Sequence, residues 1–218
     1  MAAATGCLWL FGGLAENGLT NDPIVHYDRA IAAYLHSLAN PSLTTFFLVV
    51  TALGSIEILA LVGVILARRR QWLYFWTWAA AVGGSALLNH LIKDLFARPR
   101  PSFEHPLLLE TSYSFPSGHA MESFVVYGML AYFAVLTLRS WRARTAVVTG
   151  VALLVILIGF SRMYLGVHYF SAVVAGYAAG GVWLSALITG AETIRRSKSR
   201  SNQALDEPPR ERLPQATG

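Results

Sequence analysis

Apolar residues form long runs along this chain, and charged residues collect in the segments between them. Runs with at most one charged residue cover 43–67, 73–92, 120–138, 145–160 and 169–191. The exceptions inside these runs are Glu57 and Glu122, the latter in the first turn of its run. A helix needs about 20 mostly apolar residues to cross a membrane. Four of the five runs have about that length. The remaining run, 145–160, reaches it when extended through Val167. The pattern predicts an all-α, polytopic membrane bundle.

The N-terminal part of the chain is less regular. Residues 2–15 are apolar but short, with no basic segment before them and no clear cleavage motif, which disfavours a signal peptide. We expect them to form the outer half of a first transmembrane helix whose start is missing or shortened. Residues 17–40 mix polar and apolar positions and predict, in part, an amphipathic helix on the membrane surface. The expectation is about six transmembrane helices in all.

The composition supports a membrane protein. Only 13% of the residues are charged and 55% are hydrophobic, whereas soluble domains carry about 25% charged residues. Basic residues cluster in alternate connections, which the positive-inside rule assigns to the cytoplasm. Those twelve of the 17 basic residues are Arg68–Arg70, Arg139, Arg142, Arg144, Arg195, Arg196, Lys198, Arg200, Arg210 and Arg212.

This orientation predicts one transmembrane domain over 1–196 and a disordered cytoplasmic tail over 197–218. The net charge of +5 is therefore a topology signal, and no nucleic-acid partner is expected. Cys7 is the single cysteine, so an internal disulfide and a cysteine-built metal site are excluded. The histidines are scattered without metal-ligand spacing. The oligomeric state stays open.

Three segments on the outward side carry the candidate chemistry. They are KDLFARPRP (93–101), YSFPSGHAMES (113–123) and SRMYLGVHYFSAV (161–173). Together they supply the cations Lys93, Arg98, Arg100 and Arg162, two histidines, and Ser117-Gly118 at a predicted helix start. Ionisable groups at a membrane edge indicate function. Converging cations repel one another unless an anion lies between them, and arginines and helix N-termini suit phosphate.

Two histidines beside a phosphate indicate phosphoryl transfer. One attacks phosphorus and forms a phosphohistidine, and the other protonates the leaving oxygen and then activates water. Side-chain cations stabilise the charge on the equatorial oxygens. A metal or other cofactor is not required by this scheme.

The order and spacing of these motifs resemble the type 2 phosphatidic acid phosphatase (PAP2) superfamily. Lys93 lies seven residues before Arg100-Pro101, Pro116-Ser117-Gly118-His119 follows, and Ser161-Arg162 precedes His168. The resemblance implies that His168 is the nucleophile and His119 the general acid. It further implies that Arg162 assists catalysis and binds phosphate, as do Lys93, Arg100, Ser117 and Gly118. Substrates of the superfamily are typically lipid phosphates and diphosphates, and it usually needs no metal.

One position departs from the family pattern. An aspartate usually follows the third-motif histidine by four residues, and here that residue is Ala172. Loss of a histidine-orienting aspartate costs about 10⁴ in rate in a serine protease. Glu122 is the candidate replacement, whereas Glu57 is placed too deep in the membrane. Ala172 also begins a small-residue repeat with Gly176 and Gly180, which is typical of close helix packing.

The sequence thus predicts a bacterial inner-membrane phosphatase with its site on the extracytoplasmic side. Undecaprenyl diphosphate, phosphatidic acid and phosphatidylglycerol phosphate all fit, and recycling of a polyprenyl carrier is favoured. A phosphatase of soluble esters, or a phosphotransferase, is the enzyme alternative. The other alternative is a catalytically impaired homologue that binds lipid or acts as a scaffold. Glu104 and Glu110 are expected to be solvated loop charges.

Overall fold

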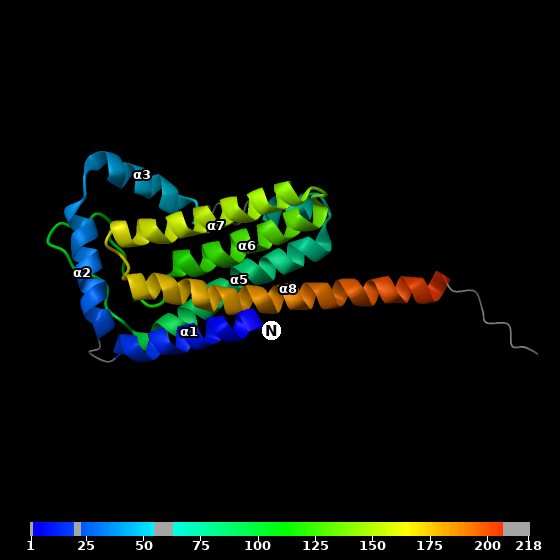
Figure 1. Ribbon diagram of the computed structural model, residues 1–218, viewed down its shortest axis with the longest axis horizontal. Coiled ribbons are helices and arrows are strands. Elements are labelled where there is room, and N and C mark those ends of the chain that lie inside the picture. The colour runs from blue at the N-terminus through cyan, green and yellow to red at the C-terminus, as the bar shows by residue number, and fades with distance from the viewer. Residues whose placement is uncertain (1, 20–22, 55–62, 207–218) are drawn as a thin grey trace, which may run out of the picture.

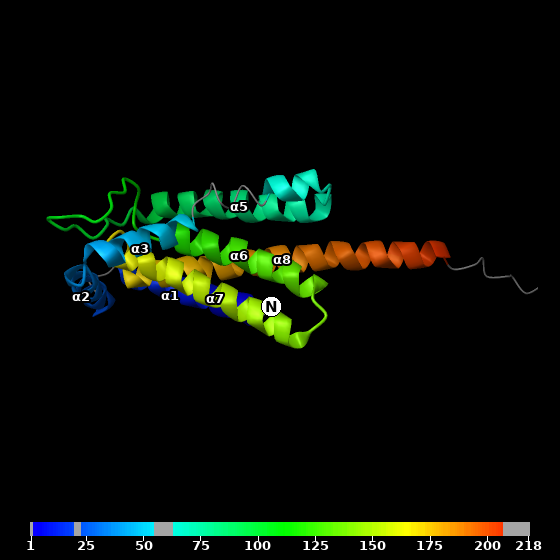
Figure 2. The same ribbon diagram turned by 90° about the horizontal axis from the view of Figure 1, so that it is seen from above.

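The computed structural model describes residues 2–19, 23–54 and 63–206, and all regular elements within them are helices. They are α1 (Ala2–Leu19), α2 (Pro23–Ser37), α3 (Pro41–Ala52), α5 (Trp72–Phe96), α6 (Gly118–Thr137), α7 (Trp141–Tyr164) and α8 (Phe170–Asp206). Five of them, α1 and α5 to α8, run side by side, while α2 lies across one end of the bundle (Figures 1 and 2). The predicted all-α bundle is confirmed.

Helix α6 is the central element of this bundle and packs against α5, α7 and α8. Its residues Met121, Val125, Val126 and Met129 have no exposed surface. In the described residues, three helices are long and apolar enough to cross a membrane. They are α6, α7 and the part of α8 from Phe170 to Ser197. These three account for half of the expected six.

The expected single helix over residues 43–67 is interrupted. Helix α3 ends at Ala52, and Leu53 and Gly54 form a turn. The Leu53 carbonyl accepts a hydrogen bond from the Tyr127 hydroxyl at 2.7 Å, so the helix end is satisfied by α6 rather than by a further turn. A Cβ on Gly54 would lie 3.0 Å from Ile158 and 3.3 Å from His119. The break therefore brings backbone close to a candidate catalytic side chain. Glu57 lies outside the described residues.

The predicted helix within 17–40 is confirmed as α2. Its buried residues are Asp28, Ala32 and Leu35, which recur at helical spacing and face the bundle. At the other end of the chain, α8 continues to Asp206. The prediction of disorder from residue 197 onward is therefore wrong for 197–206, and residues 207–218 lie outside the described part.

The small-residue face of α8 packs against the start of α6, as predicted. Ala172 is fully buried, and its carbonyl accepts a hydrogen bond from the Ser117 N–H at 2.9 Å. A Cβ on Gly176 would lie 2.7 Å from the Ser117 carbonyl oxygen, and one on Gly180 would lie 3.0 Å from that of Met121. Larger residues would push the two helices apart. This contact fixes the second motif against the third.

Candidate active site

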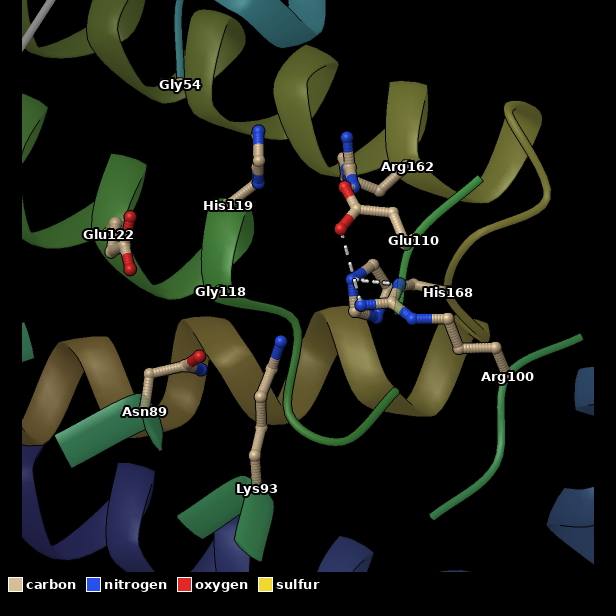
Figure 3. Close-up of a pocket in the computed structure, with 10 residues that line it drawn as sticks. All are labelled: Gly54, Asn89, Lys93, Arg100, Glu110, Gly118, His119, Glu122, Arg162 and His168. Carbon is tan, nitrogen blue, oxygen red and sulfur yellow. Dashed lines mark hydrogen bonds and ion pairs between the residues drawn. The ribbon is translucent and has the colours of Figure 1, made fainter. Parts of the chain in front are cut away.

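The three motifs converge on one cavity of about 360 Å³ at the end of the bundle that α2 crosses (Figures 1 and 3). Its lining residues are Gly54, Asn89, Lys93, Arg100, Glu110, Gly118, His119, Glu122, Arg162 and His168. Seven of these ten were predicted from the sequence. Gly54, Asn89 and Glu110 were not. Ser117 was predicted to bind phosphate but is not among the lining residues.

Ser117 has a structural position at the start of α6. It is fully buried, and its hydroxyl is the N-cap that accepts from the Ala120 N–H at 3.5 Å. Its oxygen is directed at the helix backbone, and the phosphate contact expected of Ser117 stays a prediction. Gly118 and His119 follow in the first turn and line the cavity. A Cβ on Gly118 would lie 3.0 Å from the Asn89 Oδ1, so the position accepts only glycine without rearrangement.

His168 is held by hydrogen bonds at both ring nitrogens. Its Nδ1 lies 2.7 Å from the Ser114 carbonyl oxygen, and its Nε2 lies 3.2 Å from Arg100 Nη1. A carbonyl can only accept, so Nδ1 carries the proton and Nε2 keeps its lone pair. The lone pair lies on the side of the ring that Arg100 contacts (Figure 3). This is the tautomer that a histidine nucleophile requires.

Glu122 does not take the orienting role that the sequence suggested for it. Both nitrogens of His168 have other partners, and Figure 3 places Glu122 at the far side of the cavity, beyond His119. The Ser114 carbonyl replaces the family's aspartate at Nδ1. Sequence reasoning could not find it, because the interacting atom belongs to the backbone.

The charge state of His168 follows from its surroundings. Burial lowers the pKa of this histidine well below its usual range, and the positive charges of Arg162, Arg100 and Lys93 lower the pKa further. The hydrogen bond to Ser114 opposes these effects without reversing them. His168 is therefore neutral at physiological pH, with a nucleophilic Nε2.

A turn at Gly166 positions His168 at the cavity. Arg162 lies in the last turn of α7, and Gly166 follows with φ of 71°. A non-glycine residue rarely adopts this conformation, and a Cβ there would also lie 2.9 Å from the Phe103 ring. The N–H groups of Val167 and His168 then donate back to the Arg162 carbonyl at 3.2 and 3.3 Å. The fixed spacing of Arg162 and His168 in the third motif reflects this turn.

Arg162 is 2% exposed and is the most deeply placed cation of the site. Its Nη1 donates to Thr51 at 2.9 Å and its Nη2 donates to Glu110 at 2.6 Å. Its Nε is buried and has no hydrogen-bond partner in the described residues. An unpaired buried N–H is unfavourable, and an anion in the cavity would satisfy it.

Arg100 and Lys93 reach the cavity from the first motif. Arg100 donates through Nε and Nη1 to the carbonyls of Ser112 and Val167 at 2.6 and 2.7 Å. Lys93 Nζ donates to the Ser112 hydroxyl at 2.9 Å. Both cations are thus held by one loop, at residues 98–117, and by the turn before His168. The part of this loop that lies between the two motifs, residues 102–112, was given no role in the site by the sequence.

Glu110 is a paired carboxylate of the site and not a solvated loop charge, which corrects the sequence prediction. It lies 2.6 Å from Arg162 Nη2 and 3.9 Å from Arg100 Nη2. Partial burial raises the pKa of this carboxyl, but the hydrogen bond and charge of Arg162, with the charge of Arg100, outweigh it and leave the pKa below the ordinary value. The carboxylate therefore neutralises two cations that would otherwise face each other.

A second ion pair lies behind the site and was missed. Arg98 was expected to be one of the cations that converge on an anion, yet it is 8% exposed and its Nη2 donates to Asp28 at 2.8 Å. Asp28 accepts from the N–H of Ser171 at 2.9 Å and also from its hydroxyl. Through Asp28, helix α2 thereby caps the first turn of α8, which begins shortly after His168. The sequence did contain a signal for this ion pair. Asp28 shares a helix face with Ala32 and Leu35, and a carboxylate on a buried face needs a partner.

The described residues hold no group of three or more His, Cys, Asp or Glu that could bind a metal. The cavity offers a set of fixed cations, one neutral histidine whose Nε2 lone pair faces Arg100, and a second histidine across the cavity (Figure 3). This set can bind a phosphate and place it for in-line attack by one histidine, with the other histidine near the leaving oxygen.

Comparison with known proteins found one family match and several similar proteins. Residues 72–196 match the family model described as PAP2 superfamily. Phosphatidylglycerophosphatase B of Bacillus subtilis is 32% identical over 88% of this chain and 97% of its own length. An undecaprenyl-diphosphatase of Sulfolobus acidocaldarius is 35% identical over 46% of this chain and 47% of its own.

The fold comparison agrees. The crystal structure of a transmembrane PAP2-type phosphatidylglycerolphosphate phosphatase from Bacillus subtilis superimposes with a TM-score of 0.80 and 31% identity. The match covers 89% of this chain and 98% of that one. The likeness therefore includes the whole bundle, not the motifs alone.

Proposed function

This chain belongs to the PAP2 superfamily as a phosphatase of lipid phosphates, and we propose that it acts through a phosphohistidine at His168. The observation that carries the proposal is the state of that side chain. Ser114 holds the proton on Nδ1, which leaves Nε2 free to attack, and the cations of the cavity lie around it. A phosphate oxygen bound to Arg100 would also draw its guanidinium away from Nε2.

In the first step, Nε2 of His168 forms a bond to phosphorus while the bond from phosphorus to the leaving oxygen breaks. The electron pair stays on that oxygen, and His119 donates a proton to it. Arg162, Arg100 and Lys93, with the backbone N–H groups at the start of α6, hold the equatorial oxygens. Arg162 gains a partner for its Nε.

In the second step, His119 takes a proton from water as the water oxygen attacks phosphorus. The bond from phosphorus to Nε2 breaks, and its electron pair returns to the nitrogen. Inorganic phosphate leaves, and both histidines recover their starting states. The scheme uses side-chain cations for the charge stabilisation that other phosphoryl-transfer enzymes obtain from Mg²⁺.

For the substrate we favour phosphatidylglycerol phosphate, because the relative that matches nearly over its full length carries that activity in its name. Undecaprenyl diphosphate, favoured from the sequence, is the second candidate, supported by a relative matched over about half its length. Phosphatidic acid is the third. The non-catalytic alternative, a lipid-binding or scaffold protein, is not favoured, since the Ser114 carbonyl compensates for Ala172.

For the orientation we propose an extracytoplasmic site and a cytoplasmic C-terminus. The start of α6 and the end of α7 carry the site at one end of the bundle, and the α6–α7 connection lies at the other (Figures 1 and 2). That connection contains Arg139, Arg142 and Arg144, which favours a cytoplasmic position.

The test is phosphate release by the purified protein in detergent with EDTA, using the three lipids as substrates. His168→Ala should abolish release, and exposed His26→Ala should not change it. Rapid quenching at alkaline pH should trap labelled phosphate on the wild-type chain and not on His168→Ala. Equal activity of His168→Ala and wild type would contradict the proposal.

A further inference from the structure

The cavity has two chemically different ends. Arg100, Arg162 and His168 lie at one end, while Glu122 and Asn89 lie across the cavity, on the other side of His119 (Figure 3). The phosphate chemistry described above uses the cationic end and His119. It gives no role to a carboxylate and an amide that face the same space.

The oxygens of Glu122 and Asn89 point to a common region beside Gly118. A Cβ built on Gly118 would lie 3.0 Å from Asn89 Oδ1 and 3.8 Å from Glu122 Oε1. Asn89 is only 5% exposed, and both residues line the cavity. These two acceptor atoms are therefore close to one another at a single wall.

Neither oxygen is used by the protein itself. Asn89 makes one weak contact through its Nδ2, to Met121 Sδ at 3.9 Å, and its Oδ1 accepts no hydrogen bond from the described residues. Within the same part of the chain, Glu122 forms no hydrogen bond or ion pair, and its charged neighbour is Lys93. Both acceptors line the cavity and have no donor within the described residues, so they are available to a ligand that brings hydroxyl groups.

The reaction geometry determines which part of a substrate meets this wall. In an in-line transfer, the leaving oxygen lies opposite the attacking Nε2 of His168. His119 must reach that oxygen to protonate it. The atoms bonded to the leaving oxygen then extend past His119, toward Glu122 and Asn89, and away from the arginines.

We propose that Glu122 and Asn89 form a leaving-group subsite that selects an alcohol carrying a second hydroxyl, such as a glycerol headgroup. The hydroxyl donates to the acceptor oxygens as the phosphate binds to the cations. The same wall disfavours a leaving group that is itself a phosphate. The oxygens of Glu122 and Asn89 are acceptors, as phosphate oxygens are, and Glu122 in its ionised form would repel a second anion. The subsite rests on the proposed function and makes the enzyme a monoesterase of hydroxylated lipid heads rather than a diphosphatase.

Three substrates test the subsite. They are phosphatidylglycerol phosphate, its analogue with propanediol in place of the terminal glycerol, which lacks the free hydroxyl, and undecaprenyl diphosphate. The readout is the ratio of kcat/KM between substrates, which cancels general losses of activity. For wild type we expect a preference for the hydroxylated ester over the deoxy analogue of about tenfold, the usual size for a hydrogen bond to a charged group.

Two substitutions at Glu122 separate hydrogen bonding from charge. Glu122→Met removes the acceptor and should bring the hydroxylated-to-deoxy ratio close to one. Glu122→Gln keeps a carbonyl acceptor but removes the charge, so the hydroxyl preference should persist while relative activity on the diphosphate rises about tenfold. Glu104→Gln, at an exposed loop carboxylate, is the matched control and should leave both ratios unchanged.

The outcomes distinguish this subsite from the proposed function. A wild-type enzyme that treats the hydroxylated and deoxy esters alike, with release still dependent on His168, overturns the subsite alone. Equal loss on both esters in Glu122→Met also overturns it. Release that does not depend on His168 overturns the proposed function instead. The ratio of kcat/KM between the hydroxylated and deoxy esters, measured on wild type, tests the subsite even if a Glu122 variant does not fold.

Discussion

The Ser114 carbonyl oxygen lies 2.7 Å from Nδ1 of His168. It is the hydrogen-bond acceptor that the family pattern would supply with an aspartate at position 172. A backbone acceptor fixes the tautomer without adding a charge to a buried site. It is itself held in place, because the Ser114 N–H donates to the Arg98 carbonyl at 2.9 Å and its hydroxyl to the Pro99 carbonyl at 2.7 Å. The first motif thereby positions the proposed nucleophile of the third.

Restoring the family's aspartate should harm this protein. Ala172 is fully buried in an apolar cluster with Phe115 and Ala175, so Ala172→Asp places an unpaired carboxylate there. We expect a loss of roughly 3 kcal/mol in unfolding free energy and no increase in kcat, because Nδ1 already has its acceptor. Thermal unfolding and phosphate release in the same detergent measure both. Ala172→Asn is the control of equal shape, and a more active aspartate variant would contradict the role of Ser114.

The sequence was informative wherever side chains carry the chemistry at a fixed local spacing. His119 follows a helix start, and Arg162 precedes a glycine turn to His168, so each motif encodes its own geometry. The sequence contained no signal for the contact between Ser114 and His168, because the acceptor is a backbone carbonyl and every residue has one. Glu110 was missed because its partner Arg162 is 52 residues away in the chain. The turn at Gly54 was hidden inside an apolar run, where hydropathy alone cannot separate one helix from a broken one.

The ion pair of Asp28 and Arg98 should act on catalysis through the position of α8. Arg98→Met leaves a buried, uncompensated carboxylate, and we expect a loss of roughly 3 kcal/mol in unfolding free energy. Because Asp28 caps the turn after His168, kcat should fall while KM changes little. The double variant Asp28→Leu/Arg98→Met should recover most of the stability, since no charge is left unpaired, but not kcat. Recovery of kcat together with stability would show that the pair has no positioning role.

Glu110 should compete with phosphate for Arg162. Its carboxylate lies 2.6 Å from Nη2, where a phosphate oxygen of a substrate or product would also bind. Glu110→Gln removes the competing charge, so the inhibition constant of inorganic phosphate should fall about fivefold. Steady-state kinetics with added phosphate measures it, with Glu104→Gln as the control. A higher inhibition constant in Glu110→Gln would mean that the carboxylate helps to bind phosphate through its arginines rather than competing with it.

The pH dependence of the enzyme should report the cations around His168. Burial lowers the pKa of this histidine, as do the charges of Arg162, Arg100 and Lys93, and the reaction needs its neutral form. The acid limb of kcat/KM should therefore lie below the ordinary histidine pKa of about 6.5. Arg100→Gln removes one positive charge, which raises the pKa of His168, so the acid limb should move to higher pH. Exposed Arg29→Gln, measured on the same substrate, controls for the ionisation of the lipid phosphate. An acid limb that stays in place, or moves to lower pH, in Arg100→Gln would exclude His168 as the group that sets it.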